Sequence, residues 1–142
     1  MTEKLNILIS GAAVFFIACG FYAVPAAQGG ASGSFSNAQA TRGEPVYGTQ
    51  CASCHGLELE GVPDLFPELT GASFVERWKG RSVGELFEKV MVTMPALDPG
   101  LLTPEQSADL VAYMLSTSGY ASGSADLATA QSALNAIPIG AP

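Results

Sequence analysis

Two cysteines and the single histidine of the chain have the types and the spacing for covalent chemistry. Cys51 and Cys54 are separated by two residues, and His55 follows directly. Because residues three apart share one face of a helix, both thiols could reach the two vinyl groups at one edge of a porphyrin. The imidazole of the next residue would then lie over the iron. The pattern C-x-x-C-H therefore predicts covalent attachment of haem c.

The other sites that cysteine and histidine commonly form do not suit this chain. A structural zinc site needs four thiolate or imidazole ligands, whereas the chain offers this cluster and one remote cysteine, Cys19, inside an apolar run. A thioredoxin-like pair would need a βαβ pattern, and none is visible. A simple disulfide would leave the adjacent histidine without a role. We expect one haem c, attached through Cys51 and Cys54, with His55 as an axial ligand of the iron.

The second axial ligand should be a methionine, because thioether sulfur favours the reduced iron and raises its potential. Besides the start residue, the candidates are Met91, Met94 and Met114. Met114 belongs to the apolar side of an expected helix, where core packing is the better assignment. Met94 precedes Pro95, and a residue before proline is pushed to extended geometry, so Met94 should lie on a loop. We predict Met94 as the ligand, with Met91 in reserve.

The elements that must position these residues are helical, without the alternation typical of strands. A first helix is expected over 43–52, with the cysteines at its C-terminal end. A capping box at 82–85 begins a second helix. Thr103 caps a last helix, which carries Pro104 in its first turn and ends at 118–119.

The composition limits the class of partner. At 142 residues the chain has the length of one domain, and its formal net charge is −7. So acidic a chain is not expected to bind nucleic acid through bulk charge. A protein that docks with it should present a basic or neutral face.

An uncharged apolar run occupies residues 5–24, directly after Lys4. Two interpretations remain open. The run could be the core of a cleaved secretory signal, with small residues at 24–26 before the cut. It could also be a membrane anchor, since about 20 apolar residues span a bilayer core. Lipidation at Cys19 is a third option, although the residues before it are a poor lipobox. We expect residues 1–27 to be a signal peptide or an uncleaved anchor, and both would send the rest of the chain to the periplasmic side.

The chain resembles the class I c-type cytochromes. The resemblance is carried by Gly43, Tyr47, Cys51, Cys54, His55, Gly56, Met94, Pro95 and Tyr113. It implies an all-α fold of three to five helices wrapped around one covalent haem, here preceded by an apolar N-terminal helix. In that family Gly43 would let the first and last helices cross closely, with Tyr47 and Tyr113 packing at the crossing.

The resemblance also implies a haem shell. The second ring nitrogen of a ligating histidine usually donates to a backbone carbonyl, and in this family a downstream proline supplies that carbonyl. Pro67 has the right separation from His55, and Pro63 is the less suitable choice. The remaining residues of the expected shell are Leu69 and Phe74 as apolar wall and Trp78, Arg77, Lys79 and Arg81 as propionate partners. The basic residues of this set could equally form a solvated face.

The expected organisation has four parts. Residues 1–27 are the signal peptide or anchor, 28–42 a flexible linker rich in Gly, Ser and Ala, and 43–118 the cytochrome c domain. Residues 119–142 form a C-terminal extension, with a short helix near Asp126 to Asn135.

A narrower resemblance concerns the partner. Residues 77–87, 93–95 and 112–115 are similar to the small cytochromes c that accompany quinoprotein (PQQ) dehydrogenases. Such a dehydrogenase is therefore the implied donor, with a terminal oxidase or a reaction centre as alternative partners. The expected function is outer-sphere electron transfer on the periplasmic side between a dehydrogenase or a respiratory or photosynthetic donor and a terminal acceptor, without enzymatic activity. The alternatives are a fixed haem subunit of a membrane redox complex, and a haem enzyme or gas sensor with displaceable Met94.

Overall fold

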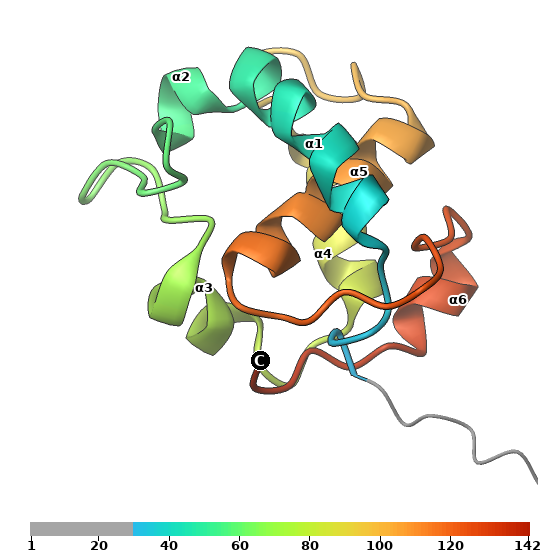
Figure 1. Ribbon diagram of the computed structural model, residues 1–142. Coiled ribbons are helices and arrows are strands. Elements are labelled where there is room, and N and C mark those ends of the chain that lie inside the picture. The colour runs from blue at the N-terminus through green and yellow to red at the C-terminus, as the bar shows by residue number, and fades with distance from the viewer. Residues whose placement is uncertain (1–29) are drawn as a thin grey trace, which may run out of the picture.

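The computed structural model describes residues 30–142 (Figure 1). The apolar run at residues 5–24, expected as a signal or anchor, lies outside the described residues. Within the described range, no helix is both long and apolar enough to cross a membrane.

Between residues 30 and 142 the chain is helical and has no named strand, so the all-α prediction is confirmed. The helices are α1 (Asn37–Gln50), α2 (Ala52–His55), α3 (Gly71–Trp78), α4 (Val83–Thr93), α5 (Pro104–Thr117) and α6 (Gln131–Asn135). Their number exceeds the expected three to five because α2 and α6 are single short turns of 4 and 5 residues.

Local capping signals begin α4 and α5 where the sequence predicted. The Ser82 hydroxyl accepts a hydrogen bond from the Glu85 backbone N–H at 3.2 Å, and the Glu85 carboxylate accepts from the Ser82 N–H at 2.8 Å. Thr103 and Gln106 form the same reciprocal pair at the start of α5. Each box satisfies two backbone donors that a helix start otherwise leaves without partners.

The first helix begins earlier than predicted. Ser36 caps α1 by accepting from the Gln39 N–H at 3.0 Å, and Phe35 just before it is fully buried. The expectation of a flexible linker through Arg42 is therefore wrong for residues 31–42. The Gly- and Ser-rich composition suggested a linker, but tertiary packing against the C-terminal extension orders this segment.

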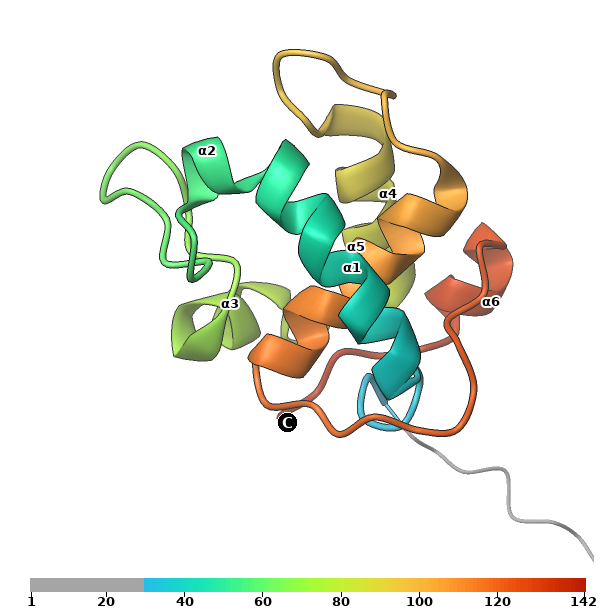
Figure 2. The same cartoon turned by 45° about the horizontal axis from the view of Figure 1, so that its top comes forward.

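Gly43 marks the point where α1 and α5 cross, not the start of α1. The two helices lie across one another near the centre of the molecule (Figures 1 and 2). A Cβ at Gly43 would collide with the backbone carbonyl of Asp109 on α5. Next to the crossing, the rings of Tyr47 and Tyr113 pack with their centroids 5.6 Å apart. The close crossing and the tyrosine pair that the family resemblance implied are both present.

The C-terminal extension forms a belt around the helices. We use the name C-terminal belt for residues 120–142. Its backbone binds the start of the described chain, with Ala31 N–H donating to Pro138 O at 2.9 Å, and the segment before α4, with Ile139 N–H donating to Arg81 O at 2.7 Å. Helix α6 packs on α4, where Gly84 leaves room for Asn135. The belt thus packs against α4 through α6.

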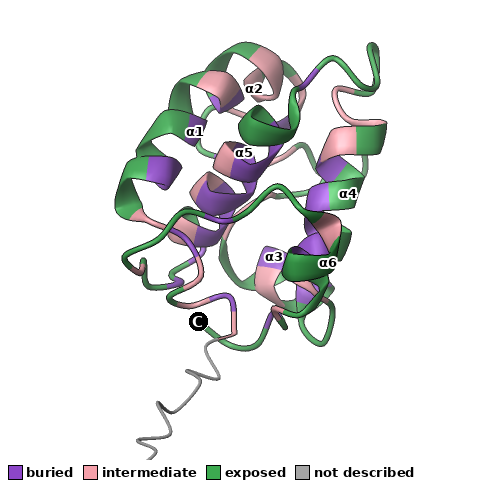
Figure 3. Cartoon of the chain, turned by 90° about the vertical axis from the view of Figure 1, so that its right-hand side faces the viewer, coloured by how far each residue is buried: buried purple, intermediate pink, exposed green. Residues whose placement is uncertain are grey.

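A charged network ties the belt to the crossing helices. The Arg42 guanidinium donates to Asp109 on α5 at 3.0 Å and to Asp126 on the belt at 2.6 Å. The hydrogen bond from the Ser36 hydroxyl, followed by that from Arg42, lowers the pKa of the Asp126 carboxyl. Among the helices, α5 carries the most buried residues and α4 the next most (Figure 3).

Candidate haem site

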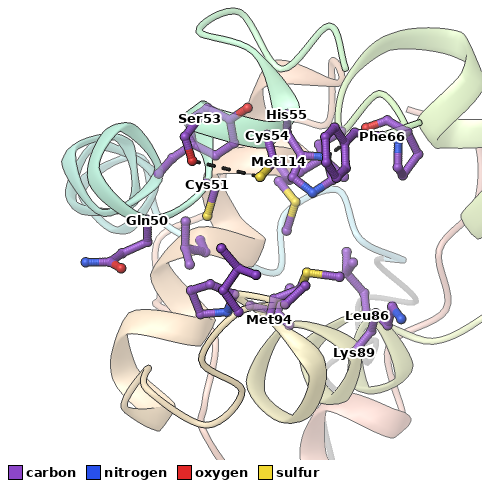
Figure 4. A pocket seen from close by; sticks show the side chains of 18 of the residues that line it. Gln50, Cys51, Ser53, Cys54, His55, Phe66, Leu86, Lys89, Met94 and Met114 are labelled. Atoms are coloured by element: carbon purple, nitrogen blue, oxygen red, sulfur yellow. Dashed lines mark hydrogen bonds between the residues drawn. The ribbon is translucent and has the colours of Figure 1, made fainter. Parts of the chain in front are cut away.

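A cavity of about 630 Å³ opens between α2, α3, α4 and the loop that precedes α5. Its volume lies within the range of about 300–1,000 Å³ that is usual for cofactor and ligand sites. Most of its lining is apolar, including Leu69, Leu86, Val90, Leu110 and Met114. Figure 4 shows its interior, with the cysteines and His55 on one wall and Met94 on the other.

The cysteines lie where α1 gives way to α2. Cys51 ends α1, and its carbonyl accepts the backbone N–H of Cys54 at 3.1 Å and that of His55 at 3.0 Å. Both thiols are free and both line the cavity. Burial raises the pKa of the Cys51 thiol to about 11, and Cys54 adds to the shift. At neutral pH this thiol is therefore protonated and less reactive than an ordinary exposed cysteine.

The ring of His55 is fixed from behind. Its Nδ1 lies 2.9 Å from the carbonyl oxygen of Pro67, and the residue is only 8% exposed. Because a carbonyl can only accept, Nδ1 must carry the proton, and the lone pair on Nε2 remains available to a metal. Phe66 packs beside the imidazole, with ring centroids 5.9 Å apart.

A second contact fixes the turn directly after His55. The hydroxyl of Tyr47, on α1, donates to the backbone carbonyl of Gly56 at 2.6 Å. Burial raises the pKa of this hydroxyl well above its usual range, so it stays protonated and remains a donor. Gly56 has φ +81°, a left-handed conformation that favours glycine. Tyr47 therefore connects the crossing helices to the histidine turn.

Met94 lies on the opposite wall of the cavity. It follows the last turn of α4 in extended geometry, and its N–H donates to Val90 O at 3.1 Å. Beyond it, a turn is closed by the N–H of Asp98 donating to Pro95 O at 3.0 Å. The reserve candidate Met91 does not line the cavity. Met114 does line it, although at 3% exposure it also packs in the core.

The expected haem shell is brought together in part. Pro67, Leu69, Arg77 and Trp78 line the cavity, whereas Phe74, Lys79, Arg81 and Pro63 do not. Phe74 is fully buried and packs behind Trp78 at 6.4 Å between centroids. The Arg81 guanidinium lies 5.3 Å from the centroid of the Trp78 ring, outside the cavity. Phe74 and Arg81 therefore do not line the cavity themselves but contact Trp78, which does, and their place in the haem shell remains a prediction.

Sequence reasoning missed Lys89, an exposed residue of α4 that lines the cavity. It follows Leu86 by three residues and therefore shares its helix face, which was the available signal. Figure 4 places Lys89 away from Gln50 and Cys51, across the cavity. Arg77 and Lys89 are the two basic residues on the lining, so an anionic edge of a bound group fits best at the α3–α4 end.

The residues present fit haem c. Two free thiols at the C-x-x-C spacing, an imidazole whose Nε2 is free and a thioether on the facing wall surround an apolar cavity with a basic end. The fold and the site together define a class I c-type cytochrome domain, with haem c as its cofactor. This chain belongs to the family described as "Cytochrome C oxidase, cbb3-type, subunit III", whose model matches residues 38–114.

Known proteins are similar to parts of this chain. The "Cytochrome bc1 complex cytochrome c subunit" of Mycobacterium tuberculosis and that of Mycobacterium bovis are each 36% identical to it over 75 residues. The aligned segment covers 49% of this chain but only 27% of each relative. The sulfane dehydrogenase SoxCD of Paracoccus pantotrophus aligns with a TM-score of 0.51 at 20% identity, over 75% of this chain and 54% of that one. This last similarity supports the fold alone.

Proposed function

We propose that the chain is a single-haem electron carrier in which His55 and Met94 bind the iron from opposite faces. The observation that carries the proposal is the pair of facing walls. One wall presents the free thiols and the imidazole fixed by Pro67, and the other presents the Met94 side chain (Figure 4). Cys51 and Cys54 would form the thioether links.

Two ligands supplied by the chain would leave no coordination position for a substrate. When bound, haem c supplies a one-electron ferric/ferrous couple. The chain would keep water from the cofactor with the apolar lining, and would balance its anionic edge with Arg77, Lys89 and the Trp78 N–H. This arrangement suits an electron carrier rather than an enzyme.

Absorption spectra of the holoprotein test the proposal. A methionine-to-ferric-iron charge-transfer band should be present, and the reduced form should not bind carbon monoxide. The haem enzyme or gas sensor, in which Met94 is displaced easily, would give the opposite result. The intact mass would report the number of attached haems and any cleavage or lipidation of the N-terminal segment in the same measurement.

The proposed setting is the periplasmic side of a membrane. The apolar run at residues 5–24 supports this setting. The names of the family and of the mycobacterial relatives also support it, because they refer to an oxidase and to the bc1 complex. Redox proteins of a respiratory chain are the proposed partners, with a terminal oxidase as the acceptor. The PQQ dehydrogenase donor rests on the similarity of residues 77–87, 93–95 and 112–115 alone.

A second candidate is a fixed haem subunit of a membrane redox complex. The family description and the relatives' names favour it, because both refer to subunits of complexes. Membranes dissolved in mild detergent would distinguish the two. A fixed subunit should copurify with an integral membrane oxidoreductase, whereas a mobile carrier should separate from it on washing with salt.

A further inference from the structure

Two loops frame the mouth of the cavity. We call residues 57–68 the first rim loop and residues 95–101 the second rim loop. Leu65 on the first and Leu97 on the second both line the cavity, yet they are 68% and 97% exposed. A side chain that lines a cavity and is also largely exposed lies at its opening. Large apolar side chains exposed to this extent at the mouth of a site are typical of an interaction surface.

Each exposed leucine has an aspartate beside it. Asp64 precedes Leu65, and Asp98 follows Leu97. Neither aspartate forms a salt bridge within the described residues, and both are exposed. Asp98 lines the cavity together with Leu97, whereas Asp64 is the exposed neighbour of Leu65 on the first rim loop and does not line the cavity itself.

No basic side chain lies on either rim loop, although the first carries Glu58, Glu60 and Glu68 as well as Asp64. Of the five basic residues between 30 and 142, Arg77 reaches the first rim loop by pairing with Glu68, and the other four have their contacts elsewhere. Arg42 pairs with Asp109 and Asp126, Arg77 with Glu68, Lys79 with Glu76, Arg81 lies over Trp78, and Lys89 lines the cavity at its α3–α4 end. The two rim loops thus carry exposed leucines and five acidic residues, of which only Glu68 has a basic partner within the described residues.

We infer that the rim loops form the docking face for a redox protein that presents lysines or arginines around an apolar patch. The inference rests on the proposed electron-transfer function. Opposite charges at the edge speed encounter, and the leucines exclude water once the two apolar centres meet. A small contact of this kind suits a transient redox encounter, which commonly buries less than about 1,200 Å².

Other occupants fit the face less well. A second copy would bring the aspartate pairs of both chains together, and like charges at an interface disfavour association. The segment before residue 30 carries one acid, Glu3, and one base, Lys4, so it has no net charge to complement the rim. A partner with basic residues around an apolar patch complements both the aspartates and the exposed leucines of the rim loops.

The test uses the complete holoprotein and two outer-sphere oxidants of opposite charge, tris(phenanthroline)cobalt(III) and hexacyanoferrate(III). Each takes one electron from the reduced haem. The variant Asp64→Asn with Asp98→Asn removes the two rim charges. Asparagine is the appropriate replacement because Asp64 has φ +60°, which asparagine tolerates. Glu44→Gln with Glu76→Gln is the matched control, since both glutamates are exposed and neither lines the cavity.

At low ionic strength, the rim variant should react about five-fold more slowly with the cobalt complex and faster with hexacyanoferrate(III). Salt should remove the difference, because screening shortens the range of the rim charges. The control should change both rates far less. If the rates of the rim variant and of the control change equally, only the net charge of the protein matters. If neither rate changes, the rim charges do not steer the oxidant. Either result overturns the inference.

The apolar centre needs its own variant. Leu97→Ser should weaken complex formation with a lysine-rich cytochrome c. An unchanged complex would overturn the apolar part of the inference. Spectra of every variant report the axial ligand before the kinetics are measured, so a failure of the His55–Met94 proposal is recognised separately from a failure of docking.

Discussion

The two walls of the cavity differ in how the chain supports them. On the His55 wall, the imidazole is fixed by Pro67, the following turn is fixed by Tyr47, and two cysteines lie on the same short segment. On the opposite wall, Met94 is placed by one hydrogen bond to the end of α4 and by a turn in the second rim loop. One wall is braced by the helix crossing, and the other rests on a loop.

This difference indicates how the two proposed ligands should behave. A ligand supported by packed helices keeps its geometry when conditions change, whereas a loop opens at lower free-energy cost. We therefore expect His55 to remain bound under mild perturbation and Met94 to be the ligand that leaves first.

Removing the covalent anchor should have the largest effect. Cys51→Ala with Cys54→Ala should abolish covalent haem, and the chain should then be poorly folded, because the cavity would lose the group that completes its core. The intact mass and the far-UV circular dichroism measure both effects. Cys19→Ala is the control and should keep its haem. A cooperative, native-like melt of haem-free protein would contradict the expectation.

Removing the thioether from the loop wall should have a smaller effect. Met94→Ala should keep the covalent haem but lose the charge-transfer band, bind carbon monoxide when reduced and show a lower reduction potential. Met91→Ala is the matched control, since Met91 does not line the cavity. Loss of the band in the Met91 variant instead would reverse the assignment of the ligand.

Removing the Tyr47 hydrogen bond from the His55 wall should have a still smaller effect. Tyr47→Phe keeps the ring packed against Tyr113 but removes the hydrogen bond to Gly56 O. We expect the free energy of unfolding of the ferric holoprotein to fall by about 1 kcal/mol. Tyr113→Phe should cost less, because its hydroxyl forms no such bond among the described residues. Denaturant titration followed at the Soret band measures both, and equal losses would remove Tyr47 as a brace.

A change far from both walls should have the smallest effect. The pKa of Asp126 is lower in the folded chain, so its contribution to stability is present above the ordinary Asp pKa of about 4 and is lost as the pH falls through the lower folded value. Asp126→Asn should therefore lose less stability than the natural chain between about pH 5 and pH 2, with an unchanged haem spectrum. Thermal melts across this range test the expectation, which identical acid profiles would contradict.

The parts of the fold that were predicted correctly depend on short segments. The capping boxes at Ser82 and Thr103 are complete within four residues, so their sequence specifies the starts of α4 and α5. The start of α1 was misplaced for the opposite reason. Gly43 looked like a boundary, but its role is to admit the Asp109 carbonyl, a contact 66 residues away in the chain.

The candidate site divides in the same way. The C-x-x-C-H spacing and the Met-Pro step are local, and they placed Cys51, Cys54, His55 and Met94 among the residues that the structure brings to the cavity. Whether a residue of α3 or α4 faces the cavity depends on how its helix packs. For that reason the sequence placed Phe74 and Arg81 in the expected haem shell although neither lines the cavity, and it missed Lys89, which does.

By itself, the sequence determined the chemistry of this protein: two thiols, one imidazole and one thioether in an order that suits haem c. Spacing along the chain is enough for the thioether links and the histidine ligand, because Cys51, Cys54 and His55 lie on one short segment, whereas for the second ligand it supplied only a candidate, Met94. Only the tertiary structure decided the paired Asp64–Leu65 and Leu97–Asp98 rim and the belt that orders residues 31–42. These features join segments distant in sequence, and only packing of the whole chain brings them together.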